Sequence, residues 1–425
     1  MPSRKRQLPT HADAVVIGGG IVGCSTALWL ARAGMRPVVC EKGRIGAEQS
    51  GRNWGWIRRI GRHPAELPLA RRALRMWRKM PEELGVDPGF VPCGIAYLCR
   101  DEGELERRRA WLEANGEAAG RDIRLLTGGQ AAELFPGANV SFAGALYAPD
   151  DGRAEPLAAT RAIATAAERR GATLLEECAV RDIVTGGGAV RGVLTEHGGI
   201  RTDTVVLAGG VWSRMLCDRL GLRLPQLGVI NSVQYTAPLE GGPRISAGEG
   251  DCAFRRTADG GYAIAHWRLS ETLLTPQHLR FLRDYLPALG DSWRDLPLRP
   301  ASPFQPWARS ASWNEGRRTP FEEARVLDPP PSARILRKAL RALRRDFPVF
   351  TEARIVRRRA GVIDVLPDIL PVIDAPAEIP GLVVATGFSG HGFGIGPAAG
   401  EAAAALATGN NPSTDIAAFS LARFR

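Results

Sequence analysis

The sequence lacks an uninterrupted run of about 18 apolar residues, which is the length that a membrane-spanning helix needs. The basic residues 1–6 are similar to the start of a secretory signal peptide, but Gly18, Gly19 and Gly20 interrupt the apolar stretch that follows. We therefore expect no transmembrane segment. Low-complexity tracts and repeats at a fixed period are also missing, which argues against a disordered chain and a solenoid.

The cysteines show no pairing pattern. There are seven of them, an odd number, and no two are spaced as Cys-x-x-Cys. This scatter argues against a disulfide framework and favours reduced thiols in a cytoplasmic protein. We expect no metal site either.

A continuous basic tract is absent, although the formal net charge is +11. The arginines are spread along the whole chain, mostly on the expected outer faces of amphipathic helices. A solvated basic surface therefore explains the charge better than a nucleic-acid site does. With 425 residues, 44% of them hydrophobic and 24% charged, the chain is expected to form two or three soluble globular domains.

A strand, a helix and a second strand are predicted close to the N-terminus. Residues 14–17 form a short apolar, β-branched run bounded by glycine, which is typical of a buried parallel strand. Residues 21–33 are helix formers followed by Gly34, and residues 37–41 predict the second strand. This order is typical of a Rossmann-type unit.

Gly18, Gly20 and Gly23 fit the pattern G-x-G-x-x-G between this strand and this helix. Gly18 allows a tight turn, Gly20 lets a pyrophosphate approach the backbone, and Gly23 lets the helix pack closely on the strand. Glu41, at the end of the second strand, is suited to accept hydrogen bonds from a ribose. The pattern predicts one bound dinucleotide, FAD or NAD, because no second complete fingerprint follows.

Further elements are predicted by the same periodicities. Helices are expected at residues 69–80, 156–170, 333–343 and 397–407, with Ser332 as a cap. Strands are expected at residues 173–176, 179–184, 190–193, 205–208, 262–265 and 382–385. The helix over 69–80 has one apolar and one arginine-rich face, which favours packing on a core over a role at a membrane surface.

A second glycine-rich segment, residues 390–396, follows the last predicted strand. Its backbone N–H groups and the positive end of the next helix would face a ligand, and the oxygen-rich pyrimidine side of a flavin suits that position. Closely spaced glycines would let a planar ring approach the backbone. The alternative is a flexible loop with a helix cap.

Together these segments resemble the D-amino-acid oxidase family of FAD-dependent oxidoreductases, which includes glycine oxidases, sarcosine oxidases, amino-acid dehydrogenases and opine-oxidase subunits. The resemblance is carried by the N-terminal fingerprint with Glu41 and Lys42, and by residues 50–53, 203–213, 366–368 and 387–394. It implies an α/β fold, α+β overall, in which a β-sheet-based substrate domain is inserted into a Rossmann-like FAD-binding domain. The FAD-binding domain would take residues 1–90, 150–227 and 355–425, and the substrate domain residues 91–149 and 228–354.

The resemblance also implies which residues bind the cofactor. They are Gly18, Gly20, Ile21, Val22, Gly23, Glu41, Lys42, Ser50, Gly51, Arg52, Asn53, Val180, Ala208, Gly209, Trp212, Gly390, His391, Gly392, Phe393, Gly394 and Ile395. Sarcosine-oxidase-like members carry a cysteine that bonds the flavin, whereas residues 361–367 contain none. FAD is therefore expected to be non-covalent.

The reaction implied by the resemblance is hydride transfer from a carbon that bears an amine to flavin N5, giving an imine. Positioning and a neutral amine supply most of this catalysis, so an obvious acid or base need not exist. Oxygen or an electron carrier would reoxidise the flavin, and a homo-oligomer or a complex is compatible with the family. Two alternatives stay open: oxidation of a 2-hydroxy acid, and a flavin subunit that only passes electrons within a complex.

Ile363 stands where many relatives that oxidise amino acids have an arginine for the substrate carboxylate. Because burying an unpaired carboxylate is too costly, either the substrate lacks one near its amine or another arginine binds it. Arg52 is our first candidate and Arg255 the second, since arginine pairs with carboxylates through two hydrogen bonds. All candidates for substrate contact are Arg52, Trp54, Trp56, Gln234, Arg255, Tyr262, His266, Arg359, Asp364 and His391. For each one except His391, a structural role explains the residue at least as well.

Overall fold

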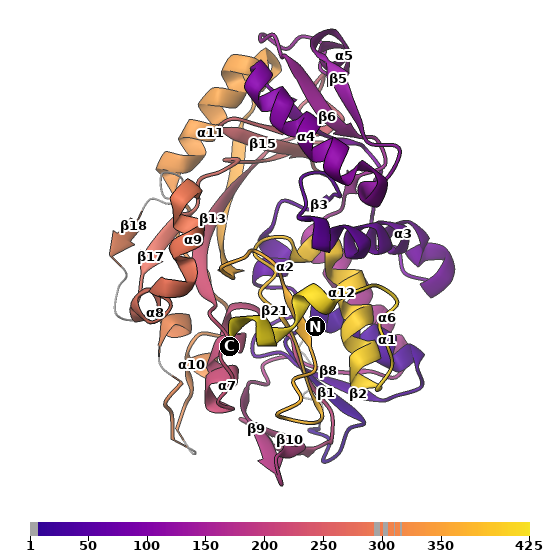
Figure 1. Cartoon of the computed structure of the whole chain (residues 1–425), viewed down its shortest axis with the longest axis vertical. Helices are drawn as coiled ribbons and strands as arrows, with labels where there is room; N and C mark the ends of the chain where they lie inside the picture. The colour runs from indigo at the N-terminus through magenta and orange to yellow at the C-terminus, as the bar shows by residue number, and fades with distance from the viewer. Residues whose placement is uncertain (1–6, 293–297, 301–304, 310, 315–316) are drawn as a thin grey trace.

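The computed structural model describes residues 7–292, 298–300, 305–309, 311–314 and 317–425. Two large sheets organise the chain, one of six strands and one of ten. The six-stranded sheet lies in the lower half of Figure 1, and helices α4 (Glu102–Ala119), α5 (Gly128–Leu134) and α11 (Ala333–Asp346) lie in the upper half with the other sheet. This is the mixed α/β architecture that the sequence predicted.

The six-stranded sheet has the order β20-β21-β12-β1-β2-β8. In sequence order its strands are β1 (Ala14–Ile17), β2 (Pro37–Cys40), β8 (Thr173–Leu175), β12 (Val205–Leu207), β20 (Val372–Asp374) and β21 (Leu382–Thr386). All neighbours run parallel except β20, which is antiparallel to β21. Val15 of β1 lies between Val38 and Val205, and every residue of β1 is buried, as expected for a central parallel strand.

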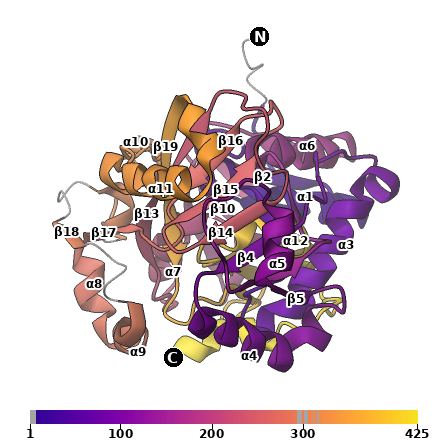
Figure 2. The same ribbon diagram turned by 90° about the horizontal axis from the view of Figure 1, so that it is seen from above.

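Both faces of this sheet are covered. On one face, Val16 and Val39 share a core with helices α1 (Ile21–Arg32), α3 (Leu67–Leu84), α6 (Pro156–Arg169) and α12 (Gly392–Ala407). On the other, Val15 and Val38 pack against β9 (Val180–Gly186), β10 (Ala189–Thr195), β11 (Gly198–Arg201) and α7 (Ser213–Arg219). Seen from above, α1, α3 and α6 lie on one side of the molecule and α11 on the other (Figure 2).

The ten-stranded sheet has the order β18-β17-β13-β16-β15-β14-β4-β6-β5, with β19 paired to β13. Its strands are β4 (Ile95–Cys99), β5 (Arg124–Thr127), β6 (Gly144–Ala148), β13 (Leu227–Thr236), β14 (Ser246–Glu249), β15 (Cys252–Arg256), β16 (Tyr262–Ala265), β17 (Glu271–Leu274), β18 (Leu298–Pro300) and β19 (Ile355–Val365). Most pairs are antiparallel, and β4–β14 and β17–β18 are parallel. The long strand β19 belongs to this sheet by its hydrogen bonds, and the domain boundaries given above stay a prediction.

Shorter elements lie between these strands along the chain. They are α2 (Gln49–Arg52), β3 (Trp56–Ile57), β7 (Gly152–Arg153), α8 (Pro276–Arg280), α9 (Leu282–Ser292) and α10 (Pro320–Glu323). In the described part of the chain, no helix has the length and apolarity needed to cross a bilayer. All seven cysteines are free, and the described residues hold no cluster of acidic, histidine or cysteine side chains suited to a metal.

The start of α12 and the cap of α11 differ from the sequence-based expectations. Helix α12 begins at Gly392 instead of Pro397, so most of the segment expected to be a glycine loop is helical. Glycine disfavours a helix by itself, but Gly396 and Gly400 pack so closely on α1 that a Cβ at Gly400 would lie 2.4 Å from the Cβ of Ser25. The hydroxyl of Ser332 makes no capping hydrogen bond to α11, and its backbone N–H donates to Ser232 Oγ on β13 at 2.9 Å.

Candidate functional site

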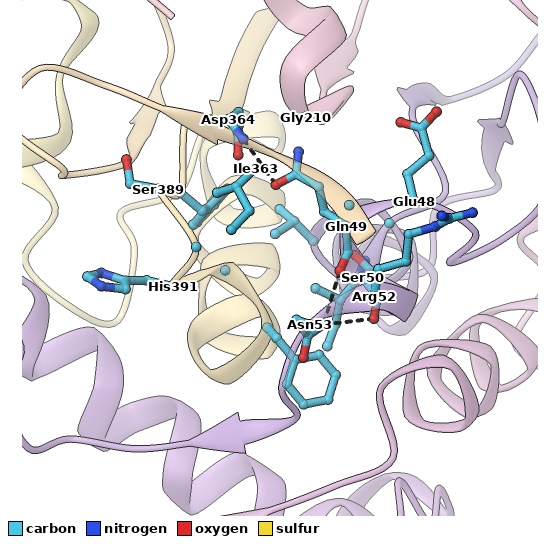
Figure 3. Close-up of a pocket in the computed structure, with 18 of the residues that line it drawn as sticks. Glu48, Gln49, Ser50, Arg52, Asn53, Gly210, Ile363, Asp364, Ser389 and His391 are labelled. Carbon is cyan, nitrogen blue, oxygen red and sulfur yellow. Dashed lines mark hydrogen bonds between the residues drawn. The ribbon is translucent and has the colours of Figure 1, made fainter. Parts of the chain in front are cut away.

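One cavity of about 550 Å³ brings together segments from most of the chain (Figure 3). Of the predicted cofactor residues, its lining includes Gly18, Gly20, Ile21, Val22, Glu41, Lys42, Ser50, Arg52, Asn53, Val180, Ala208, Gly209, Trp212, Gly390, His391, Gly392, Phe393 and Gly394. The lining does not include three of the predicted residues, Gly23, Gly51 and Ile395. Ile395 is fully buried in the core of the first sheet, so a direct cofactor contact from its side chain is not supported.

The turn between β1 and α1 has no room for side chains. Gly18 has a φ of +108°, and a Cβ there would lie 2.5 Å from the carbonyl oxygen of Ala208. A Cβ at Gly23 would lie 2.0 Å from the carbonyl oxygen of Gly18, which explains the close packing of α1 on the turn. The hydroxyl of Ser50 accepts a hydrogen bond from the N–H of Ile21 at 2.9 Å. Bare backbone and a helix N-terminus therefore face the cavity, as a pyrophosphate requires.

Glu41 is fixed by the backbone at the end of β2. Its two carboxylate oxygens accept hydrogen bonds from the N–H groups of Gly19 and Gly43, both at 2.7 Å. Burial raises the pKa of this carboxyl, against the opposing effect of Lys42 and the two backbone donors. Each oxygen keeps further lone pairs, so the side chain can also accept from a ligand hydroxyl in the cavity.

The ammonium of Lys42 forms all of its hydrogen bonds with other residues of the chain. Its ammonium donates to Glu48 Oε1 at 2.7 Å and to the carbonyl oxygens of Ala324 and Arg325 at 2.8 and 2.9 Å. An ammonium has three N–H donors, so none is left for a phosphate. The ammonium of Lys42 therefore ties a distant segment to the cavity wall. Glu48 also accepts from Trp212 Nε1 at 3.0 Å, which orients that ring.

Asp364 shapes the turn that precedes α12. Its carboxylate accepts hydrogen bonds from the N–H of Gly387 at 2.8 Å and from Gln226 Nε2 at 2.9 Å. Burial raises the pKa of Asp364, partly offset by these donors. Its own N–H donates to Gln49 Oε1 at 3.3 Å (Figure 3). Asp364 therefore positions the backbone that faces the cavity, and because it also lines the cavity, its contact with a substrate stays a prediction.

His391 stands at the start of α12 and contacts two buried residues of another segment. Its Nδ1 lies 3.0 Å from Glu66 Oε2, and Arg62 Nη1 lies 3.5 Å from Glu66 Oε1. Burial and the charge of Arg62 lower the pKa of His391 to about 4. Burial alone would raise the pKa of Glu66, but Arg62 and His391 outweigh it and lower that pKa to about 2. The histidine is therefore neutral and the glutamate ionised at neutral pH, so Nδ1–H donates to the carboxylate.

Aromatic rings form the other end of the cavity. The ring centroids are 4.8 to 6.4 Å apart in five pairs formed by Trp54, Trp56, Tyr97 and Trp267. Trp54 Nε1 donates to Asn231 Oδ1 at 3.2 Å. We refer to this end, together with the arginines named next, as the aromatic chamber.

Four arginines line the aromatic chamber, and sequence analysis had named none of them. They are Arg58, Arg62, Arg108 and Arg268. Arg58 follows Trp54 and Trp56 at intervals of two in an extended segment, so strand periodicity could have placed it on their face. Arg108 comes from α4 and Arg268 from beyond β16, and no local pattern relates them to the fingerprint.

Five predicted substrate residues lie outside the cavity lining, namely Gln234, Arg255, Tyr262, His266 and Arg359. Gln234 and Ser232 face α11, where Gln234 Nε2 donates to the carbonyl oxygen of Leu336 at 2.9 Å. Side chains alternate along a strand, so Asn231 faces the cavity instead. The Tyr262 hydroxyl donates to the carbonyl oxygen of Pro243, and His266 Nδ1 accepts N–H bonds from residues 268 and 269.

Neither of the two arginines expected to bind a carboxylate has a free guanidinium. Arg255 is completely buried and forms two hydrogen bonds with Glu155, at 2.7 and 3.0 Å. Arg52 lines the cavity, but its guanidinium pairs with Asp328 and donates to the carbonyl oxygen of Ala360 at 2.9 Å. In Figure 3 it points away from Ile363 and His391. Both arginines therefore join segments of the chain.

Comparison with known proteins identifies relatives along the whole chain. Residues 13–406 match the family described as FAD dependent oxidoreductase (DAO). Human mitochondrial sarcosine dehydrogenase is 32% identical over 56% of this chain, and the match spans 26% of that longer protein. Glycine oxidase of Geobacillus kaustophilus is 32% identical over 54% of this chain and 64% of its own length. The solved structure of L-amino acid deaminase from Proteus myxofaciens, in complex with anthranilate, has a TM-score of 0.95 at 34% identity and covers 100% of this chain and 96% of that one.

Proposed function

Because this chain belongs to the DAO family of FAD-dependent oxidoreductases, we propose that it binds FAD in the 550 Å³ cavity and oxidises an amine or amino acid. The observation that carries the proposal is the continuity of this cavity. It extends from the glycine turn and Glu41, past the start of α12, to the aromatic chamber. A dinucleotide end and a substrate end are thus joined in one space.

The residues fit FAD at three points. The bare turn at Gly18 and Gly20 and the N-terminus of α1 would hold the pyrophosphate, and Glu41 would accept from the adenosine ribose. The turn before α12 would approach the flavin ring, because a Cβ at Gly390 would meet nothing closer than 3.7 Å. The positive end of α12 would face the oxygen-rich edge of that ring. We propose that the flavin is not covalently bound.

The flavin, when bound, supplies the hydride acceptor, and the protein supplies binding, orientation and exclusion of water. The rings of Trp54, Trp56 and Trp267 would exclude water from the substrate and fix its orientation. Exclusion of water by these rings disfavours an ammonium beside them, which lowers the pKa of a substrate amine and keeps it neutral. A neutral amine has the lone pair that stabilises positive charge as hydride leaves its carbon.

Substrate reduction of the bound flavin under anaerobic conditions tests the proposal. We expect amines or amino acids to bleach the visible absorbance of the flavin and 2-hydroxy acids of matched structure to leave it unchanged. Bleaching by hydroxy acids alone would favour the other enzyme class. Bleaching by dithionite but by no organic donor would favour a subunit that only passes electrons. Oxygen or an added carrier would then be compared as the oxidant of the reduced flavin.

A further inference from the structure

Two guanidinium groups meet at one aromatic ring in the aromatic chamber. The Cζ atoms of Arg58 and Arg108 lie 5.8 and 4.9 Å from the centroid of Tyr97. Tyr97 belongs to β4 and is buried, and its hydroxyl donates to the carbonyl oxygen of Ile60 at 3.2 Å. The ring is therefore fixed, and it holds two cations from separate segments at the wall of the same cavity.

Neither cation has a carboxylate within ion-pair distance in the described part of the chain. Arg58 donates through Nη1 to the carbonyl oxygen of Ile60 at 2.6 Å, which leaves the ionic charge of its guanidinium unpaired. The neighbouring Arg59 shows the contrast, because Asp122 and Asp151 bind its guanidinium at 2.6 and 2.8 Å. Carboxylates thus neutralise Arg59 but neither Arg58 nor Arg108.

The other charges of the chamber nearly cancel. Arg62 is paired with Glu66, whose low pKa keeps it ionised, and His391 is neutral. Arg268 lies 3.7 Å from Glu104. Two positive charges remain, those of Arg58 and Arg108. Arginine keeps its proton at any ordinary pH, so these two half-buried guanidinium groups are available to bind an anionic ligand.

We propose that the substrate is an amine that carries two carboxylates, one bound by Arg58 and the other by Arg108. This inference rests on the proposed function and specifies the substrate class of the same site. An arginine can bind a carboxylate through two parallel charge-assisted hydrogen bonds. The attraction between the two charges is stronger beside the tryptophan rings than in bulk water, because the rings lower the local dielectric constant. A substrate with one carboxylate would leave one of the two cations without a counter-charge. Ile363 fits the same picture, because the carboxylates bind at the arginines of the chamber and not beside β19.

Binding of unreactive anions to the oxidised, FAD-loaded protein tests the inference without turnover. Glutarate and succinate are titrated against butyrate and propionate, and the shift of the flavin absorbance reports occupancy. We expect each dicarboxylate to bind about tenfold to a hundredfold more tightly than its monocarboxylate, as one further charged contact provides. Equal affinities of the two kinds of anion would overturn the inference.

Variants locate the two contacts. Arg58→Met and Arg108→Met should each reduce the preference for dicarboxylates to less than threefold, because each variant keeps only one of the two carboxylate contacts. Arg107→Met is the matched control, because Arg107 is exposed on the same helix one residue away and does not line the cavity. A preference that persists in both chamber variants, with FAD content unchanged, would also overturn the inference.

Measurement of substrate oxidation distinguishes a failure of this inference from a failure of the proposed function. With both enantiomers of each, kcat/KM for glutamate should exceed that for 2-aminopentanoate, which lacks the second carboxylate. If no amine reduces the flavin although dicarboxylates bind tightly, the proposed function fails while the two-anion site stands. If 2-aminopentanoate is oxidised as well as glutamate and dicarboxylates bind no better than monocarboxylates, only the two-carboxylate inference fails.

Discussion

His391 Nδ1 and Glu66 Oε2 lie 3.0 Å apart, although 325 positions separate the two residues in the chain. The contact ties the start of α12 to the residue that precedes α3. Arg62 extends it, because its Nη2 also donates to the carbonyl oxygen of His391 at 3.4 Å. The turn that we propose faces the flavin is therefore held by these three residues, and each of them has a measurable consequence.

The first prediction concerns pH. His391 has a pKa of about 4 in the folded protein, against 6.5 for an unperturbed histidine, so the unfolded chain binds its proton at a higher pH. The contribution of His391 to the free energy of unfolding should therefore be fully present above pH 6.5 and be lost as the pH drops from 6.5 towards 4. We expect this residue to account for on the order of 1–3 kcal/mol of the loss.

Denaturant unfolding of the flavin-free protein between these pH values checks the prediction. His391→Asn should show a shallower loss of stability than the wild type over this window. The difference between the two curves isolates His391 from carboxyl groups that titrate nearby. Parallel curves would show that His391 does not titrate as proposed.

The second prediction concerns the buried ion pair. Glu66→Gln leaves the guanidinium of Arg62 buried without its carboxylate, since both side chains are at most 2% exposed. Breaking such a pair costs about 3–5 kcal/mol. The double variant Arg62→Met/Glu66→Gln should recover part of this loss, because no unpaired charge remains. Thermal unfolding of Arg62→Met, Glu66→Gln and the double variant measures the coupling, and additive losses would contradict it.

The third prediction concerns the ribose contact. Glu41→Ala should weaken FAD binding by about thirtyfold, the effect of losing hydrogen bonds worth roughly 2 kcal/mol. Glu41→Gln keeps one acceptor oxygen and should lose less affinity. Quenching of FAD fluorescence gives both dissociation constants, and circular dichroism controls for the fold. An unchanged affinity in Glu41→Ala would exclude the ribose role.

The fourth prediction compares two glycines with positive φ. A Cβ at Gly18 would clash with the backbone at Ala208, whereas a Cβ at Gly34, with a φ of +87°, meets nothing within 4 Å. Gly34→Ala should therefore cost only about 1 kcal/mol and leave FAD content unchanged. Gly18→Ala should cost clearly more and abolish FAD binding. Equal FAD content in the two purified variants would contradict the tight turn.

The fifth prediction concerns how the flavin is held. Among the described residues that line the cavity, the one thiol is Cys40, at the end of β2 next to Glu41 and away from the turn before α12. Acid precipitation of the FAD-loaded protein should thus release the yellow colour into the supernatant. Colour that stays in the pellet would establish a covalent link instead.

The cofactor half of the site could be predicted from the sequence because its restraints are local. The turn at Gly18, the packing of Gly23 and the position of Glu41 depend on a strand, a helix and a strand that follow one another directly. Such short-range order is visible in periodicity and in glycine spacing. The start of α12 was missed for the opposite reason, since packing against α1 stabilises a glycine-rich first turn that propensity alone disfavours.

The substrate half was decided by tertiary structure. Whether Asn231 or Gln234 faces the cavity depends on the register of β13 with β16 and β19, and a shift by one residue would exchange the two faces. Arg58 and Arg108 meet only because β4 places Tyr97 between an extended segment and α4. The sequence by itself therefore determined the family fold and the dinucleotide turn, whose hydrogen bonds join near neighbours. Only the folded chain, through pairings between distant strands, determined which arginines remain available for a substrate.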